Sequence, residues 1–169
     1  FEVYGTKSTS PRIVNVRDSV VTVKFDEQFP SKTFPWLSST STVYIVPIKP
    51  EYHTELFPDS ILRTESPLSF IENKPHRNSI SKSYISHSWN RNLKSGDIVV
   101  FYRTGGLYKG VTTTIGIVEE AISGISNAQE LIEICKKRSV LTDKELTEYW
   151  ERYPKHRPFV FNFLYAFSF

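Results

Sequence analysis

Apolar residues occur along this chain mostly in short runs, and short runs bounded by turn residues are typical of β-strands. Three runs rich in β-branched and aromatic residues predict core strands, and two further segments have an alternating character. A tight turn at Ser95-Gly96-Asp97 leads directly into the most apolar of these runs. The predicted strands span residues 43–48, 79–86, 98–102, 112–119 and 159–169.

The N-terminal part of the chain predicts a smaller, separate unit. Short strands are expected at residues 1–4, 13–16 and 20–25. The stretch 30–42 is rich in proline, serine and threonine, which predicts a linker. We therefore expect N-terminal strands and a linker over residues 1–40, followed by one domain over residues 41–169. The chain contains no methionine, even at position 1, so we expect a fragment or a processed product.

Two helices are predicted between the last two strands. Asn127 and Thr142 are each followed three residues later by a glutamate, which is the pattern of a capping box at a helix start. Apolar residues then recur at helical spacing, and Pro154 and Pro158 end the second helix. The order of elements predicts an α+β fold, a small mixed β-barrel with two or three flanking helices.

Composition and charge narrow the function classes. Aromatic residues make up 14% of the chain, and the formal net charge is only +3. The charge is unevenly placed, because residues 73–118 hold seven Lys or Arg against one acid, whereas residues 119–151 hold eight acids against four Lys or Arg. We expect separate basic and acidic surfaces. The single cysteine, Cys135, excludes an internal disulfide and favours a reducing, cytoplasmic location, and no apolar run approaches the ~18 residues that a membrane span needs.

Basic and aromatic side chains alternate within residues 73–118, a pattern that favours nucleic-acid binding. Cations contact phosphates, and exposed rings stack on bases. Trp89 lies in a polar loop, so we expect it to be exposed, whereas core packing explains Tyr102 better. The glycines after Thr104 would let the backbone approach a ligand. The candidate nucleic-acid-binding residues are Lys82, Ser83, Tyr84, Trp89, Arg91, Tyr102, Arg103, Thr104, Lys109 and Arg157.

No cofactor is expected from these patterns. The histidines are dispersed, and no pair of them has the spacing of metal ligands, which argues against a zinc site. The basic surface has a simpler explanation as a solvated loop region, and this alternative remains open at the level of sequence.

The Gly96-Asp97 turn into strand 98–102, the strand 114–118, the helical insertion after it and the aromatic strand 159–169 resemble the PUA-like superfamily. The resemblance covers roughly residues 43–169 and is to the EVE, ASCH and YTH branches. It implies a barrel that reads RNA or DNA, in some members by taking a modified or flipped base into an aromatic pocket. The Gly-x-Lys-x-x-Glu signature of the ASCH branch is absent from this chain.

Two other functions stay open. An amidohydrolase or nuclease of the ASCH type would use Lys82 as base, a nearby serine as nucleophile and Glu119 as acid. The opening residues 1–5 resemble the late strand of a GNAT acetyltransferase, which would make this chain its C-terminal regulatory module. The acetyl-CoA-binding turn of that family is absent, so no transferase chemistry is assigned to this chain. No residue is assigned a catalytic role, and a nucleic-acid reader is the favoured function.

Overall fold

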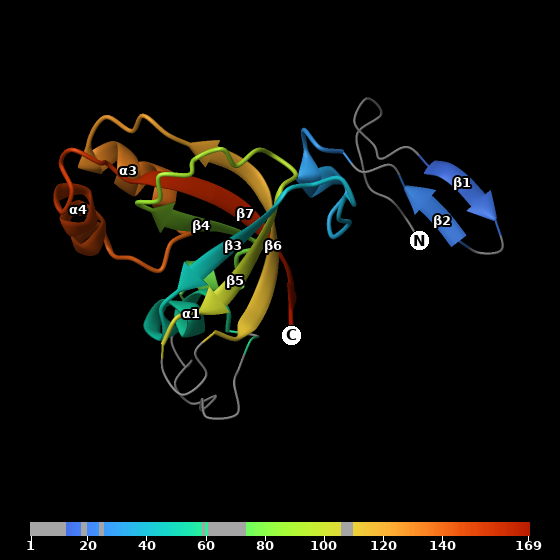
Figure 1. The fold of residues 1–169 in the computed structure, drawn as a ribbon, viewed down its shortest axis with the longest axis horizontal. Helices are drawn as coiled ribbons and strands as arrows, with labels where there is room; N and C mark the ends of the chain where they lie inside the picture. The colour runs from blue at the N-terminus through green and yellow to red at the C-terminus, as the bar shows by residue number, and fades with distance from the viewer. Residues whose placement is uncertain (1–12, 18–19, 24–25, 59, 61–73, 106–109) are drawn as a thin grey trace.

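The computed structural model describes residues 13–17, 20–23, 26–58, 60, 74–105 and 110–169 (Figure 1). Its centre is a five-stranded sheet in the order β3-β5-β6-β7-β4. β3 runs parallel to β5, and the other neighbours are antiparallel. The mixed sheet with its helices confirms the α+β class. The strands are β3 (Val43–Ile48), β4 (Ser81–Ser86), β5 (Ile98–Arg103), β6 (Thr112–Ile122) and β7 (Phe159–Ser168).

Four α-helices lie around this sheet within the described residues. They are α1 (Pro50–Leu56), α2 (Pro75–Asn78), α3 (Ala128–Cys135) and α4 (Asp143–Glu151). α3 and α4 pack on each other in the insertion between β6 and β7, on the left in Figure 1. The two predicted helices are therefore confirmed, whereas the short α2 was not predicted, because a four-residue helix has no apolar periodicity.

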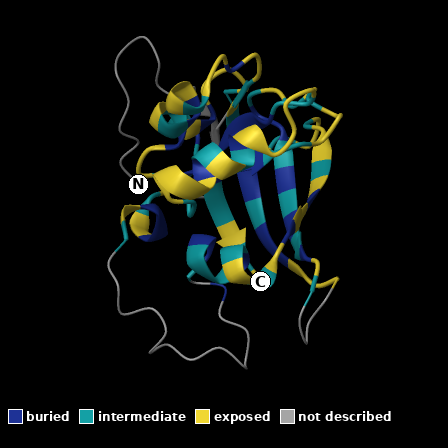
Figure 2. Cartoon of the chain, turned by 90° about the vertical axis from the view of Figure 1, so that its left-hand side faces the viewer, coloured by how far each residue is buried: buried dark blue, intermediate teal, exposed yellow. Residues whose placement is uncertain are grey.

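The core divides into two clusters on opposite faces of the sheet. Buried residues, dark blue in Figure 2, lie along the central strands. Successive residues of a strand point to opposite faces, and β7 follows this rule. Phe161 and Phe163 pack with Phe101 and with Phe57, which follows α1. Val160 packs with the apolar side chains of α3 and α4. β7 therefore contributes to both clusters, which explains why its residues 159–164 are all buried.

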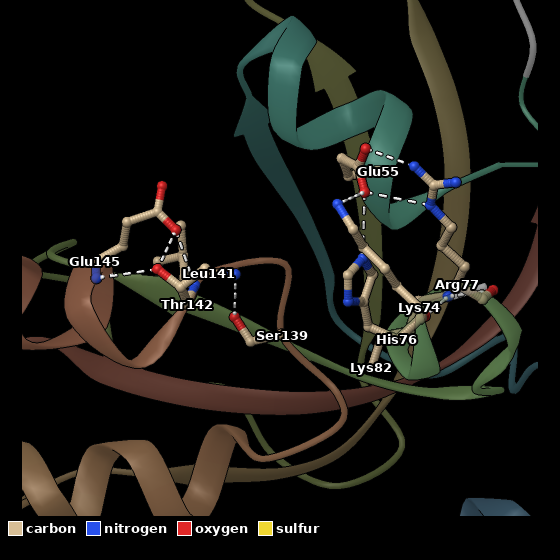
Figure 3. A network of polar contacts seen from close by, with 9 residues as sticks. All are labelled: Glu55, Lys74, His76, Arg77, Lys82, Ser139, Leu141, Thr142 and Glu145. Atoms are coloured by element: carbon tan, nitrogen blue, oxygen red, sulfur yellow. Dashed lines mark hydrogen bonds and ion pairs between the residues drawn. The ribbon is translucent and has the colours of Figure 1, made fainter. Parts of the chain in front are cut away.

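Capping residues set the starts of α3 and α4 as predicted, with one correction. Thr142 Oγ1 accepts from the Glu145 backbone N–H, and the Glu145 carboxylate accepts from the Thr142 N–H at 2.8 Å (Figure 3). At α3, Asn127 Oδ1 accepts from Glu130 N–H at 2.9 Å, but the Glu130 carboxylate accepts from Ser126 N–H instead of Asn127 N–H. The reciprocal bond is shifted by one residue, so only α4 has the complete capping box.

The N-terminal region forms a hairpin of β1 (Ile13–Arg17) and β2 (Val20–Val23), which lies apart from the main sheet in Figure 1. The expected linker contains a 3₁₀ turn, Pro30–Lys32. It contacts the main sheet near β5, where Ser41 Oγ donates to Gly96 O at 2.7 Å. The expected strand at 1–4, with its acetyltransferase resemblance, lies outside the described residues, and the boundary near residue 40 stays a prediction.

The two edge strands, β3 and β4, approach each other because the sheet curls. The Tyr84 hydroxyl on β4 donates to Pro47 O on β3. The outer edge of β4 also meets the insertion, since Ser83 N–H donates to Arg138 O at 3.1 Å. The sheet is therefore an open barrel whose gap lies between β3 and β4. Among the described residues, no helix combines the length and the apolar character that crossing a membrane requires.

Candidate nucleic-acid interface

A cavity of about 470 Å³ occupies the gap between β3 and β4. Side chains from α1, from α4 and from the segment before α4 complete its walls. Its volume lies within the range of roughly 300–1,000 Å³ that is usual for small-molecule pockets. We refer to this space as the β3–β4 cavity.

Three tyrosines supply aromatic walls to the β3–β4 cavity. Tyr52 comes from α1, Tyr84 from β4 and Tyr149 from α4, and all three are half-buried. Burial raises the pKa of the Tyr84 and Tyr149 hydroxyls, so both remain neutral at physiological pH. Neutral aromatic rings in a partly apolar cleft are suited to hold a flat heterocycle by stacking.

Hydroxyl groups provide the polar part of the lining. Ser83 is buried, and its Oγ donates to Asn162 Oδ1 on β7 at 2.6 Å. Thr104, just after β5, donates from Oγ1 to Ile48 O at 3.3 Å. Ser139 Oγ accepts from Leu141 N–H at 3.1 Å. The lining is therefore built from oriented hydroxyls that belong to three separate parts of the chain.

Charged side chains surround the mouth of the cavity. Lys49 lies 3.9 Å from Glu51, and the Arg152 guanidinium lies 5.7 Å from the centre of the Tyr149 ring. Glu148 pairs with Lys144 at 3.8 Å. Hydrogen bonds from the backbone and side chain of Thr142 lower the pKa of Glu145. The mouth thus carries exposed groups of both signs around a more apolar interior.

A second group, which we call the Trp89 cluster, consists of Trp89, Arg91, His156 and Arg157. Trp89 is 85% exposed, as expected, and its ring stacks on that of His156 with centroids 3.8 Å apart. Arg91 Nη2 donates to Arg157 O at 2.6 Å. Arg157 is anchored on α4, because it donates to Trp150 O at 2.6 Å and its guanidinium lies over the Trp150 ring at 4.5 Å. The cluster combines an exposed ring with two anchored cations.

His87 connects the Trp89 cluster to the β3–β4 cavity. Its backbone oxygen accepts from His156 Nε2 at 2.8 Å, and its ring lies 4.4 Å from the ring of Tyr149. Burial, followed by the positive charges of His156, Arg152 and Arg91, lowers the pKa of His87. His87 is therefore mostly neutral at pH 7. Two ring pairs, Trp89 with His156 and His87 with Tyr149, are joined by the bond from His156 to the His87 backbone and end at the cavity wall, and we refer to them together as the row of rings.

The structure brings six of the predicted residues into these two groups. Ser83, Tyr84 and Thr104 line the cavity, whereas Trp89, Arg91 and Arg157 form most of the Trp89 cluster. The sequence predicts Tyr149 in the buried stripe of the second helix, whereas the structure has it half-buried in the cavity lining. Sequence reasoning missed Arg152, which follows the last residue of α4 and carries no signal of its own.

The remaining four predicted residues either lie away from both groups or fall outside the residues that the structure describes. Lys82 shares its face of β4 with Tyr84, but it lies farther along the strand, where Nζ donates to His76 O at 2.7 Å (Figure 3). It lines a different space of about 430 Å³ beside Tyr165. Tyr102 is half-buried and Arg103 is buried on β5, and neither lines the β3–β4 cavity. Lys109 lies outside the described residues.

The residues of the enzyme alternative are divided between two faces of β4. Ser81 Oγ donates to the Glu119 carboxylate, so a serine and the expected acid do meet. Lys82 follows Ser81 in the strand and points away from that pair, because adjacent strand residues alternate between faces. Within the described residues, no group of three His, Cys, Asp or Glu side chains is arranged to hold a metal ion.

Comparisons with known proteins give one structural likeness. No family model matches the chain, and no curated protein matches it. Among solved structures, a mutant of the ZmASCH protein from Zymomonas mobilis matches with a TM-score of 0.46 and 10% sequence identity. The match covers 75% of this chain and 68% of that chain. At this identity no residue role carries over from that protein to this chain.

Proposed function

We propose that this domain binds single-stranded nucleic acid and holds one unstacked base, plain or modified, in the β3–β4 cavity. The observation that carries the proposal is the row of rings that joins the cavity to the Trp89 cluster. Bases stack on exposed aromatic side chains regardless of sequence. A strand that follows this row would therefore deliver a base to the cavity while its neighbours stack outside.

Cations beside the row would contact the phosphates of such a strand. Arg91 and Arg157 accompany Trp89, and Arg152 lies over Tyr149 at the mouth of the cavity. Phosphate contacts supply most of the affinity in sequence-independent binding, and they weaken as salt displaces them. With few cations available, we expect moderate affinity that depends on ionic strength.

Fluorescence anisotropy with labelled single-stranded RNA and DNA tests the proposal. Affinity should fall as salt rises from about 50 to 200 mM. Trp89→Ala should cost about 1–3 kcal/mol of binding free energy through the lost stack. Arg152→Ala should reduce the slope of log affinity against log salt by roughly 0.7 for a single strand. If neither RNA nor DNA binds at the lowest salt, the proposal is wrong.

Matched controls come from the segment 26–42, which lies away from α3 and α4 in Figure 1. Trp36 is 52% exposed, so Trp36→Ala removes an exposed tryptophan without touching the row of rings. Lys32→Ala removes one cation from the same segment. Equal losses in Trp89→Ala and Trp36→Ala would show that binding does not use the row.

A further inference from the structure

The side chains that line the β3–β4 cavity change in character with their depth. All the charged residues that the structure describes in the lining are exposed at the mouth, namely Lys49, Glu145, Glu148 and Arg152. The buried and half-buried residues described in the lining carry no charge, and most of them are aliphatic or aromatic. A ligand that enters the cavity therefore passes a charged mouth and meets an uncharged interior.

Aliphatic side chains from four parts of the chain line this interior. Ile48 ends β3, Leu56 ends α1 and Ile85 lies on β4, and all three are buried. Val140 and Leu141, from the segment before α4, are half-buried. Apolar groups that a ligand buries against such side chains strengthen binding, by about fourfold for each methylene group. The interior therefore favours an alkyl group.

The polar side chains described in the interior are hydroxyls, and part of their hydrogen-bonding capacity is already used. Ser83 turns its hydroxyl to Asn162 Oδ1, and Tyr84 donates to Pro47 O. The other hydroxyls can meet part of a base edge, but a plain base carries donors and acceptors around most of that edge. A polar group that is buried without a partner weakens binding, whereas an alkyl group needs no partner.

The cavity is also larger than one flat base requires. Pockets of roughly 300–1,000 Å³ usually take a drug-sized molecule, and the β3–β4 cavity measures about 470 Å³. A base that lies against the tyrosine rings therefore leaves space beside the aliphatic side chains for a further group.

We infer that the site selects a base that carries a bulky apolar substituent, such as a branched five-carbon alkenyl group on its exocyclic amine. The substituent lies among the aliphatic side chains of the interior, the base lies against the tyrosine rings, and the sugar and phosphates stay at the charged mouth. This inference rests on the proposed function and specifies the kind of modified base that the cavity holds.

Two RNA oligonucleotides of one sequence test the inference in the same anisotropy assay. One carries adenine and the other carries N6-isopentenyladenine at a single central position. We expect the isopentenyl RNA to bind at least about tenfold tighter, because it buries several methylene-sized groups. Equal or weaker binding of the isopentenyl RNA overturns the inference, while binding of the plain RNA still supports the proposed function. No binding of either RNA at the lowest salt overturns both.

Three variants locate the substituent. Val140→Phe fills the interior, so the preference for the isopentenyl RNA should fall several-fold. Val43→Phe makes the same change at a position that is 54% exposed and outside the lining, and it should leave the preference unchanged. Trp89→Ala should weaken the binding of both RNAs equally. A preference that survives Val140→Phe overturns the inference, and its loss in Trp89→Ala would then place the substituent on the exposed tryptophan.

Isothermal titration calorimetry keeps the inference testable if circular dichroism shows that Val140→Phe does not fold. Burial of apolar surface makes the heat-capacity change of binding more negative. With the parent protein, this change should be more negative for the isopentenyl RNA than for the plain RNA. Equal heat-capacity changes for the two RNAs would show that the substituent stays in water, which overturns the inference.

Discussion

The ring of Phe163 on β7 lies so close to Gly116 on β6 that a Cβ at position 116 would clash with its Cδ2. Phe163 is fully buried among other phenylalanines and has little room to move. Gly116→Ala should therefore destabilise the fold by about 1–3 kcal/mol, as overpacking does. Urea denaturation measures this loss.

Gly105→Ala is the matched control for that experiment. Its Cβ would meet Pro50 at 3.8 Å, which is ordinary van der Waals contact. We expect a change within about 0.5 kcal/mol. If both alanine variants are equally stable, the sheet relaxes around Phe163 and the packing argument is wrong.

Glu55 on α1 forms a bidentate ion pair with Arg77 on α2, which links the two helices (Figure 3). The Arg77 side chain is 6% exposed, so removing the charge of its partner Glu55 should cost more stability than removing an ion pair at the surface. Glu55→Gln should lower the free energy of unfolding by about 1–3 kcal/mol. Glu51→Gln, which removes an exposed pair with Lys49, should change it by no more than about 1 kcal/mol. The reverse ranking in denaturant melts would contradict this account.

Stability should decrease as the pH falls below about 6.5, the usual pKa of histidine. Burial and nearby cations lower the pKa of His87, and burial, only partly opposed by Glu55, lowers that of His76. The unfolded chain then binds more protons than the folded chain in this window, so acid favours unfolding. Urea midpoints at pH 5, 6, 7 and 8 follow the effect. His87→Gln should flatten the pH dependence, and an undiminished slope would exclude His87 as a cause.

Thr142→Ala should weaken the start of α4 by about 1 kcal/mol, because it removes the side-chain half of the capping box. The same change removes one of the bonds that lower the pKa of Glu145. Since a lowered carboxyl pKa gives stability that is lost as the pH falls below its unfolded value, Thr142→Ala should also lose less stability between about pH 5 and 3 than the parent chain. Thr142→Ser keeps the hydroxyl and serves as control. Thermal melts across this pH range provide the measurement.

Local patterns predicted the elements well where each element carries its own signal. The run at 43–48 is β3 residue for residue, and Thr142 begins α4 as its spacing with Glu145 indicates. α2 was missed, since Pro75–Asn78 is too short for periodicity. The Glu130 carboxylate accepts from Ser126 N–H and not from the expected Asn127 N–H, because sequence spacing alone does not distinguish neighbouring N–H groups.

The candidate site was only partly predictable, because it depends on which strand edges meet. Tyr84 and Pro47 face each other across the gap although 37 positions separate them. Alternation along residues 79–86 placed Lys82 and Ser83 on opposite faces, but it could not show which of the two faces the insertion covers. Arg152 lies at the cavity because of how α4 packs on the rest of the fold, and no local sequence pattern specifies that packing.

The bond from Ser83 N–H to Arg138 O gives the insertion between β6 and β7 a protective role. β4 is an edge strand, and an exposed edge is a template for pairing with another chain. By occupying a backbone donor of that edge, the insertion shields β4 from intermolecular β-addition. A shortened loop in place of residues 123–158 would therefore leave the backbone groups of this edge exposed, and we expect such a variant to self-associate.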